Sequence, residues 1–422
     1  MDLQKKIFDF LNSPETIERY RESSTDFTRS CPLSFPTVAT SILHLFKESV
    51  EYNLQALLPG LTTRVVTGSA FTQARYKIRP AFFKDLGQWV SDTYRASEKK
   101  VWKGHVLLAG DGSTLNLPSS KDIKEYFGIH STNDKGINRY LGRVFFLYDV
   151  LNDFVVESRL SKMECGEKVL LRDCLPSLGR DREIIILDRA FGNFCTLKEL
   201  PGGKLSFCVR LGLNNSNFAK RALKDKRTDF ITVWNPSPRE QESCRKHGLD
   251  PEPMRVRVVK IPLKTGEIEL LVTSLCDQAT YTTEELDQLY QLRWGVEEGF
   301  KNLKPKMKLE HFGCKKTRGV FQEFYAHIFY INMVSLIGLA ADDAIQQKTA
   351  HRKWQYKYNW KNAYRFLRAK MINILLLEEI GDVLDELIAS LSACLVAVKP
   401  DRQFVRDTRY LNKKGRITPF HK

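Results

Sequence analysis

The sequence is poor in the features that hold secreted and zinc-stabilised proteins together. Its nine cysteines are scattered and form no CxxC pair. We therefore expect buried thiols in a reducing compartment, and we predict neither a disulfide framework nor a zinc module. The opening stretch MDLQKKIFDFLNSPE contains no sustained apolar run, so we expect no secretory signal. These absences favour a cytoplasmic protein.

One long segment lacks charge altogether. From Phe324 to Ala341, eighteen residues pass without Asp, Glu, Lys or Arg, which is at the threshold for a membrane span. His327, Asn332 and Ser335 interrupt the segment, and no second span follows. We predict a buried helix, within an apolar stretch from Arg318 to Ala341, that packs behind a sheet.

Acidic residues are outnumbered, with 50 Asp and Glu against 66 Lys and Arg, a net charge of +16. The excess is spread along the chain, so it is not one disordered tail. A polyanionic partner is expected, and nucleic acid is the first candidate. Ribosomal and membrane-surface proteins are also basic, so charge alone does not decide. Hydrophobic content of 42% and 422 residues indicate a globular protein of about two or three domains.

From His105 the pattern of a mixed α/β domain begins. Apolar runs predict five strands, at residues 105–110, 143–150, 154–161, 183–187 and 205–211. Helical segments are expected at residues 167–178 and 191–200. Asp111 follows the first strand and Asp188 the fourth. An order of three strands, helix, strand, helix, strand matches an RNase H-like core, with acidic residues on the first and fourth strands and on a late helix.

That late helix is the stretch LYQLRWGVEEGFKNLK, from Leu289 to Lys304. At about 100° per residue, Tyr290, Arg293, Glu297 and Lys304 fall within an arc of about 60°. A carboxylate suits a hard divalent cation, and the cationic groups beside it suit phosphate oxygens. The alternative is a solvated salt bridge on a mixed-charge helix.

The spacing Tyr-x2-Arg-x3-Glu-x6-Lys of these four residues resembles the signature of the insertion-sequence 4 family of DDE transposases. The resemblance extends over roughly residues 35–418. It identifies Asp111 in AGDGSTL, Asp188 in ILDRAF and Glu297 as the catalytic and metal-binding triad. It also implies that Tyr290, Arg293 and Lys304 hold DNA phosphates, with Arg189 following the second aspartate as in the family.

Three carboxylates at one place repel one another unless cations neutralise them. Two Mg²⁺ ions about 3.5–4 Å apart would do so and would clamp the attacking and leaving oxygens of a phosphoryl transfer. Mn²⁺ would substitute, whereas Zn²⁺ would recruit His or Cys. We therefore expect two Mg²⁺ ions per active site.

The region before residue 100 is expected to be helical. A helical pattern runs from Phe35 to Leu58 and ends at Pro59-Gly60. Ser69 is a candidate N-cap for a basic helix that carries Arg75 and Lys77, which could enter a major groove. An ordinary helical hairpin is equally consistent, but SAFTQAR resembles the N-terminal region of the same family, which favours DNA binding by Arg75 and Lys77.

Two segments flank the late helix in sequence. Candidate strands at residues 229–234, 254–263 and 267–275 predict a β-rich insertion, and the resemblance implies the same. Some relatives stack a flipped base on a tryptophan whose position here is Glu269, so Trp234 is our candidate for base stacking. Residues 351–370 interleave basic and aromatic side chains without an acidic one, which suits DNA or a helix with core aromatics.

We predict an α/β protein with an RNase H-like catalytic core, interrupted by a β-rich insertion, and with helical N-terminal and C-terminal regions. The expected divisions are residues 1–100, 101–212, 213–275, 276–345 and 346–422. The resemblance implies a bacterial, nucleoid-associated transposase that cuts at terminal inverted repeats and joins the ends to target DNA, acting as a homodimer. The alternatives are a DDE-type nuclease without strand transfer and an inactive transposase-derived regulator.

Overall fold

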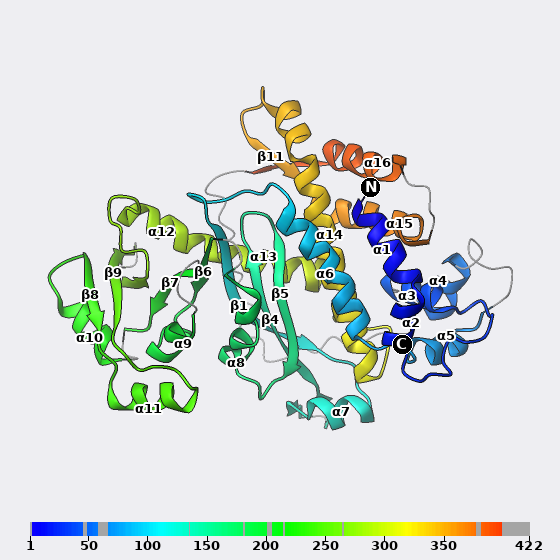
Figure 1. Cartoon of the computed structure of the whole chain (residues 1–422), viewed down its shortest axis with the longest axis horizontal. Helices are drawn as coiled ribbons and strands as arrows, with labels where there is room; N and C mark the ends of the chain where they lie inside the picture. Colours follow the sequence, from blue (N-terminus) through cyan, green and yellow to red (C-terminus); the bar gives the residue numbers. More distant parts are fainter. Residues whose placement is uncertain are drawn as a thin grey trace.

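A computed structural model gives the fold and describes residues 2–44, 49–57, 66–134, 136–179, 182–200, 205–213, 216–263, 266–376 and 381–398. The predicted breaker pair Pro59-Gly60 and the basic tail from residue 401 lie outside these residues. A central sheet separates two groups of elements, as Figure 1 shows. Helices from both ends of the chain gather on one side, and the insertion extends from the other.

The sheet has eight strands in the order β5-β4-β1-β6-β7-β10-β9-β8. Its first five are β1 (Val106–Asn116), β4 (Leu141–Asp149), β5 (Phe154–Lys162), β6 (Glu183–Leu187) and β7 (Leu205–Leu211). The first three pair antiparallel, whereas β6 and β7 run parallel to β1. The short strands β2 (Ser131–Thr132) and β3 (Asn138–Arg139) form a separate hairpin. The predicted RNase H-like strand order is thus confirmed.

The insertion strands continue this sheet. They are β8 (Asp229–Trp234), β9 (Met254–Pro262) and β10 (Ile268–Thr273). Strand β10 pairs antiparallel with β7, with Leu271 opposite Arg210. Helices α10 (Asn217–Lys224) and α11 (Pro238–Lys246) belong to the same segment. The insertion therefore shares hydrogen bonds with the catalytic sheet.

Helices cover both faces of the sheet, because side chains of successive strand residues point to opposite sides. On β1, Leu108 packs with α8 (Glu167–Arg172) and α9 (Phe194–Glu199), together with a short 3₁₀ turn η2 (Leu175–Ser177). Leu107 packs on the other face, with Ile184 and Tyr290. Burial on both faces of the sheet explains why β6 is apolar apart from its first residue, Glu183.

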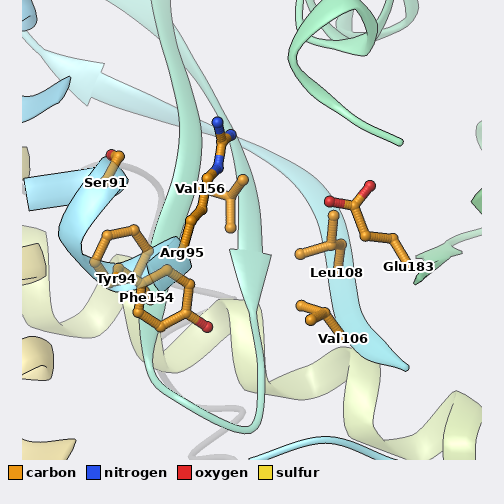
Figure 2. Close-up of a pocket in the computed structure, with 8 residues that line it drawn as sticks. All are labelled: Ser91, Tyr94, Arg95, Val106, Leu108, Phe154, Val156 and Glu183. Atoms are coloured by element: carbon orange, nitrogen blue, oxygen red, sulfur yellow. The ribbon is translucent and has the colours of Figure 1, made fainter. Parts of the chain in front are cut away.

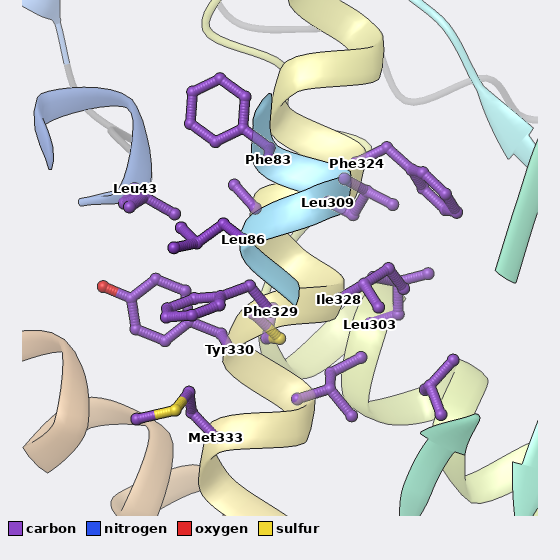
Figure 3. Packing of buried hydrophobic residues seen from close by; sticks show 14 of the residues in the cluster. Leu43, Phe83, Leu86, Leu303, Leu309, Phe324, Ile328, Phe329, Tyr330 and Met333 are labelled. Atoms are coloured by element: carbon purple, nitrogen blue, oxygen red, sulfur yellow. The ribbon is translucent and has the colours of Figure 1, made fainter. Parts of the chain in front are cut away.

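The uncharged segment lies in the 33-residue helix α14 (Thr317–Thr349). It is the helix in the described residues that is long and apolar enough to cross a membrane, but 78% of its apolar window is buried inside the protein. Phe324, Phe329 and Tyr330 belong to the same buried cluster as Phe83 and Leu86 of helix α6 (Ala81–Ala96) (Figure 3). The prediction of a buried helix is confirmed.

The two ends of the chain share one core with α14. The N-terminal helices are α1 (Asp2–Asn12), α2 (Pro14–Tyr20), α3 (Phe35–Leu43), α4 (Val50–Leu57) and α5 (Gly68–Arg75). The C-terminal elements are β11 (Gln355–Tyr358), α15 (Trp360–Leu376), α16 (Gly381–Ala393) and β12 (Leu395–Val398). Trp360 and Tyr364 are buried and stacked. These two aromatics of the basic segment therefore belong to the core.

Two local expectations are corrected. Helix α5 begins two residues earlier than predicted, because Thr67 rather than Ser69 is the N-cap and accepts a 3.2 Å hydrogen bond from the amide of Ala70. The helix ends at Arg75, so Lys77 lies after it. A small pocket between α6 and the start of β1 (Figure 2) is lined by Tyr94 and Glu183 among others; it lies away from the predicted catalytic residues.

Candidate active site

The two predicted catalytic aspartates lie side by side on neighbouring strands. Strand β1 pairs in parallel with β6 as far as Gly110 and Leu187, so Asp111 and Asp188 are the next residues on each strand, about 4.8 Å apart in the strand-to-strand direction. Leu107 on β1 and Ile184 on β6 lie on the face that packs against Tyr290. Asp111 and Asp188 each come four residues later, so their side chains point to the same face. Both carboxylates therefore belong to that face.

The position of Asp111 corrects one expectation. Strand β1 does not end there but runs on to Asn116, paired with β4 alone. Strand β6 does end before Asp188, whose carboxylate accepts a 2.9 Å hydrogen bond from the amide of Ala190 in the following turn. The two aspartates thus lie where β6 ends. Beyond this point β1 continues with β4 as its strand partner.

The late helix is wound in four parts. Helix α12 (Thr283–Gln291) passes into a 3₁₀ turn η3 (Leu292–Trp294), then α13 (Gly295–Lys301) and a π turn η4 (Asn302–Lys306) that contains Pro305. The prediction of one regular helix is therefore wrong, although the capping residues between the parts all keep helical backbone angles. Arg293 and Glu297 remain about one turn apart.

Two glycines let this helix approach the sheet closely. A Cβ atom on Gly299 would lie 2.8 Å from the ring of Tyr148, and one on Gly295 would lie 3.0 Å from Val150. Tyr148 is on β4 and Val150 directly follows it. Small residues at these positions bring the backbone of α13 against the edge of the strand pair that carries Asp111.

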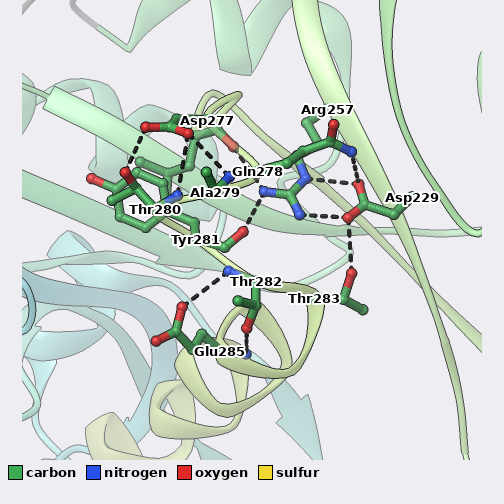
Figure 4. A network of polar contacts seen from close by, with 11 residues as sticks. Asp229, Arg257, Asp277, Gln278, Ala279, Thr280, Tyr281, Thr282, Thr283 and Glu285 are labelled. Atoms are coloured by element: carbon green, nitrogen blue, oxygen red, sulfur yellow. Dashed lines mark hydrogen bonds and ion pairs between the residues drawn. The ribbon is translucent and has the colours of Figure 1, made fainter.

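A polar network fixes the start of the helix (Figure 4). Arg257 on β9 is fully buried and binds both carboxylate oxygens of Asp229 on β8. Asp229 also accepts a 2.8 Å hydrogen bond from Thr283 at the first residue of α12. Thr282 and Glu285 form a capping box there. The insertion thereby anchors the helix that carries the glutamate.

Burial pushes the pKa of Asp229 upward, but hydrogen bonds from Arg257, Thr283 and Gln278 outweigh it and lower that pKa below its ordinary value. The carboxylate is therefore held in its charged form. A charge-assisted, bidentate pair of this kind also fixes orientation.

Residues of the helix contact β1 at two points. Arg293 Nη1 lies 3.8 Å from Asp111 Oδ2, and Lys304 Nζ donates a 2.7 Å hydrogen bond to Ser113 Oγ. Glu297 lies on the same side of the helix, one turn after Arg293 and about two turns before Lys304. Its carboxylate is half-buried and makes no hydrogen bond or ion pair with any residue that the structure describes. A third carboxylate without a partner among the described residues is thus carried by α13, the helix that packs on β1.

The pKa of Asp111 reflects a crowded anionic site. Burial raises it to about 6, and the charges of Asp188 and Glu167 push in the same direction. The amide of Gly112 and the guanidinium of Arg293 oppose this shift. Arg293 therefore offsets only part of the repulsion.

Sequence reasoning did not find Glu167, which opens α8. Its carboxylate pairs with Arg143 on β4 at 2.9 Å, and a Cβ atom on Gly112 would lie 2.3 Å from its Oε1. The glycine after Asp111 is thus the only local signal, because it leaves room for this second acidic group behind the strand.

Three of the residues predicted to contact DNA are buried in this structure. Arg75 is buried, with its guanidinium 3.1 Å from Glu323 on α14. Trp234 is fully buried and stacks on Phe218 at 4.2 Å between ring centroids. Tyr290 is 3% exposed, and burial raises its pKa to about 12. None of the three can reach a phosphate or a base from these positions.

Glu269, in the position of the relatives' tryptophan, is buried and paired with Arg210 at 2.9 Å, so it does not face DNA. The other predicted contacts remain accessible. Arg189 is exposed on the turn after Asp188, and Lys77 is exposed and 3.3 Å from Asp26.

The donor set fits a hard divalent cation. Asp111, Asp188 and Glu297 offer oxygen ligands only, the chemistry that Mg²⁺ or Mn²⁺ prefers. The pKa of Asp111 is raised, and the carboxylate of Glu297 has no partner among the described residues. Both features are expected of a cation site in which the protein's own cationic side chains do not neutralise the carboxylates.

Two strand aspartates and a helix glutamate on one face of an RNase H-like sheet are the arrangement expected of a DDE enzyme site. A family model, the Transposase DDE domain, matches residues 102–333, more than half of the chain. The chain therefore belongs to this family of DDE transposases, within the insertion-sequence 4 group, and depends on divalent metal as the family does.

Two individual proteins were also found to be similar. The transposase InsG for insertion sequence element IS4 of Escherichia coli strain K12 is 24% identical over 344 residues, 77% of this chain and 74% of that protein. Among solved structures, the cryo-EM structure of the piggyBac transposase synaptic complex with hairpin DNA superimposes with a TM-score of 0.48 and 12% identity, covering 96% of this chain and 87% of that chain.

Proposed function

We propose that this transposase moves DNA by cutting and pasting, with Asp111, Asp188 and Glu297 as its catalytic, metal-binding residues. The observation that supports the proposal is the parallel register of β1 and β6, which ends at Gly110 and Leu187, directly before the two aspartates, while the helix of Glu297 packs on β1 and β4. Two Mg²⁺ ions, with Mn²⁺ as substitute, would activate a nucleophile and stabilise the leaving oxygen when bound there.

Both steps are phosphoryl transfers. In the first, a water oxygen bonds to the phosphorus at the element end, the bond to the 3′-oxygen breaks, and a 3′-hydroxyl is released. In the second, that hydroxyl attacks a target phosphodiester, and the target's own 3′-oxygen leaves. Neither step consumes an external energy source, since one phosphodiester replaces another in strand transfer.

Cationic side chains around the triad would position the DNA. Arg293 and Lys304 reach along β1, and exposed Arg189 follows Asp188. Their guanidinium and ammonium groups suit phosphate oxygens. Lys77, with the N-terminal helices, would contact DNA farther from the cut. Tyr290 would act indirectly, because its ring lies against the Arg293 guanidinium, 5.9 Å from ring centroid to Cζ.

The test is cleavage of end-labelled DNA that carries the element's terminal inverted repeats, incubated with the full chain in Mg²⁺. Cleavage should disappear with chelator and in Asp111→Asn, and persist in the exposed control Asp134→Asn. A second, target DNA separates the alternatives: joined products indicate a transposase, cleavage without joining a nuclease, and neither an inactive regulator. Undiminished cleavage by Asp111→Asn would overturn the site.

Second-strand cleavage can proceed with or without a hairpin. A hairpin requires an aromatic platform for the flipped base, because unstacking costs a few kcal/mol. Trp294 is 46% exposed beside Arg293, so it replaces buried Trp234 as the candidate. A denaturing gel should show a hairpin that Trp294→Ala diminishes. A hairpin unchanged in that variant would exclude Trp294, and no hairpin at all would indicate the other route.

The setting of the reaction follows from the same assignment. We propose that the protein acts on terminal repeats as a homodimer, in the bacterial cytoplasm at the nucleoid, with the five divisions of the chain given above as its working parts. Light scattering with and without end DNA would test the dimer.

A further inference from the structure

A second cluster of metal-binding side chains lies outside the catalytic site. Cys195 Sγ, a carboxylate oxygen of Glu199 and a ring nitrogen of His247 lie within 4.8 Å of one another. Cys195 Sγ is 3.7 Å from Glu199 Oε1. Three different ligand types from two separate helices thus converge on one point.

Helical spacing explains the convergence. Cys195 and Glu199 are four residues apart on α9, so they share a face. Cys244 and His247 are three residues apart, the first on α11 and the second its C-cap. The expectation that the chain carries no zinc module did not anticipate this group, because Cys195 and Glu199 lie about fifty residues before His247.

Cys244 lies beside this group of three. It is fully buried on α11, which packs on α9, but its sulfur is not among the ligand atoms that lie within 4.8 Å of one another. One sulfur, one carboxylate and one imidazole make a three-ligand set that zinc can take with water as its fourth ligand, and soft sulfur disfavours Mg²⁺.

The competing explanation is an ordinary ion pair. Arg172 binds Glu199 Oε1, which neutralises the carboxylate without a metal. The thiol of Cys195 donates to the same oxygen, but neither contact accounts for the approach of His247. The side chain of Arg172 is 36% exposed, so it can turn to solvent and leave the carboxylate to another cation.

We propose that Cys195, Glu199 and His247 bind one zinc ion. Helix α9 follows the turn after Asp188, and α11 lies between insertion strands β8 and β9. The ion would therefore join the insertion to the segment that leads away from the second catalytic aspartate. This proposal does not rest on the catalytic assignment, because it concerns other residues and another metal.

The test is metal analysis of the full chain purified without chelator and without added zinc, then titrated with Zn²⁺. One equivalent of zinc per chain is expected, with a rise in Tm of at least about 4 °C over chelator-treated protein. Replacement by Co²⁺ should give the visible absorption of a tetrahedral thiolate site. Asp111→Asn and Glu297→Gln should retain the zinc, which separates this site from the catalytic one.

Variants assign the ligands. Cys195→Ser and His247→Ala should each lower bound zinc at least tenfold, whereas the exposed controls Cys31→Ser and His130→Ala should keep one equivalent. His247 is exposed, so its variant is expected to fold even if Cys195→Ser does not. Zinc content below about a tenth of an equivalent in the wild type, or unchanged zinc binding and Tm in His247→Ala, would overturn the proposal.

Discussion

Two buried arginines, Arg75 and Arg293, face carboxylates in different parts of the molecule, and their surroundings differ sharply. Their side chains are similarly hidden, 5% and 8% exposed. Arg75 lies 3.1 Å from Glu323, and all three of its nitrogens find acceptors, the others being Gln322 and Gly313. Arg293 is 3.8 Å from its carboxylate, and its Nε has no partner among the described residues.

The difference separates structure from chemistry. The pair of Arg75 and Glu323 joins the N-terminal helices to α14 and leaves nothing for a ligand. The site around Arg293 holds more negative charge than it neutralises, with Asp111 at a raised pKa and Glu297 unpartnered. Unsatisfied polar groups persist where a ligand satisfies them, so the loosely paired arginine supports the proposed active site.

The largest expected effect concerns the unsatisfied site. Glu297→Gln should lower the rate of cleavage at least about 1000-fold, since it removes a metal-binding charge from the transition state. Stability should change by less than about 0.5 kcal/mol, because the carboxylate has no partner among the described residues. Single-turnover cleavage and thermal unfolding measure the two. A Gln variant that cuts at near the wild-type rate would contradict the assignment.

The satisfied pair should behave in the opposite way. Arg75→Ala should destabilise the fold by about 3–5 kcal/mol, because it leaves Glu323 buried and unpaired. Per folded molecule, cleavage should be nearly unchanged. Denaturant unfolding measures the loss, and the double variant Arg75→Met/Glu323→Leu should recover much of it. A fully stable Arg75→Ala with impaired DNA binding would restore the DNA-contact hypothesis.

The insertion network supplies an intermediate case. Asp229→Asn should cost about 1.5–3 kcal/mol, the range for hydrogen bonds to charged groups. Since the pKa of Asp229 is lower folded than unfolded, its stabilisation is present above the unfolded pKa, near 3.9, and is lost as pH falls through the folded one. The stability difference from wild type should thus be constant between pH 5 and 7 and shrink below about pH 4. A pH-independent difference would exclude the charge as its cause.

The smallest effect is on salt dependence. Lys304→Ala should weaken end binding and flatten the slope of log affinity against log salt by about one unit for the lost phosphate contact. Lys301→Ala is the matched control, since its ammonium is 2.6 Å from Glu298 on the exposed side of the helix. Equal slopes in Lys304→Ala and wild type would show that Lys304 serves only β1, through Ser113.

Sequence patterns located elements well and single side chains poorly. Runs such as EIIIL and LSFCVRL predicted β6 and β7 with correct ends, because strands buried on both faces are continuous apolar runs. Arg75 and Trp234 were misassigned, because a basic or aromatic residue at helical or strand spacing reads the same whether its partner is DNA or a distant core residue. The partner of Arg75 is Glu323, which is far away in the sequence. The partner of Trp234 is Phe218, which carries no recognisable sequence signature.

The site shows the same limit. The order of strands predicted that Asp111, Asp188 and Glu297 would meet, and the parallel register brings the aspartates to one level. The 3₁₀ and π turns of the glutamate helix were not predictable, because residue propensities do not distinguish these turns from an α-helix. The approach of Glu167 could not be seen either, since only the glycine that admits it is visible.

The pairing of β10 with β7 has a consequence for how the chain can be altered. Strand β7 is interior only because the insertion covers its outer side. Excision of the insertion would expose a flat row of unpaired backbone amides and carbonyls along Leu205–Leu211, the kind of edge that recruits other chains and aggregates. The insertion thus prevents the edge of β7 from pairing with other chains. Shortened forms of this enzyme would need a substitute for it before they could remain free of aggregates.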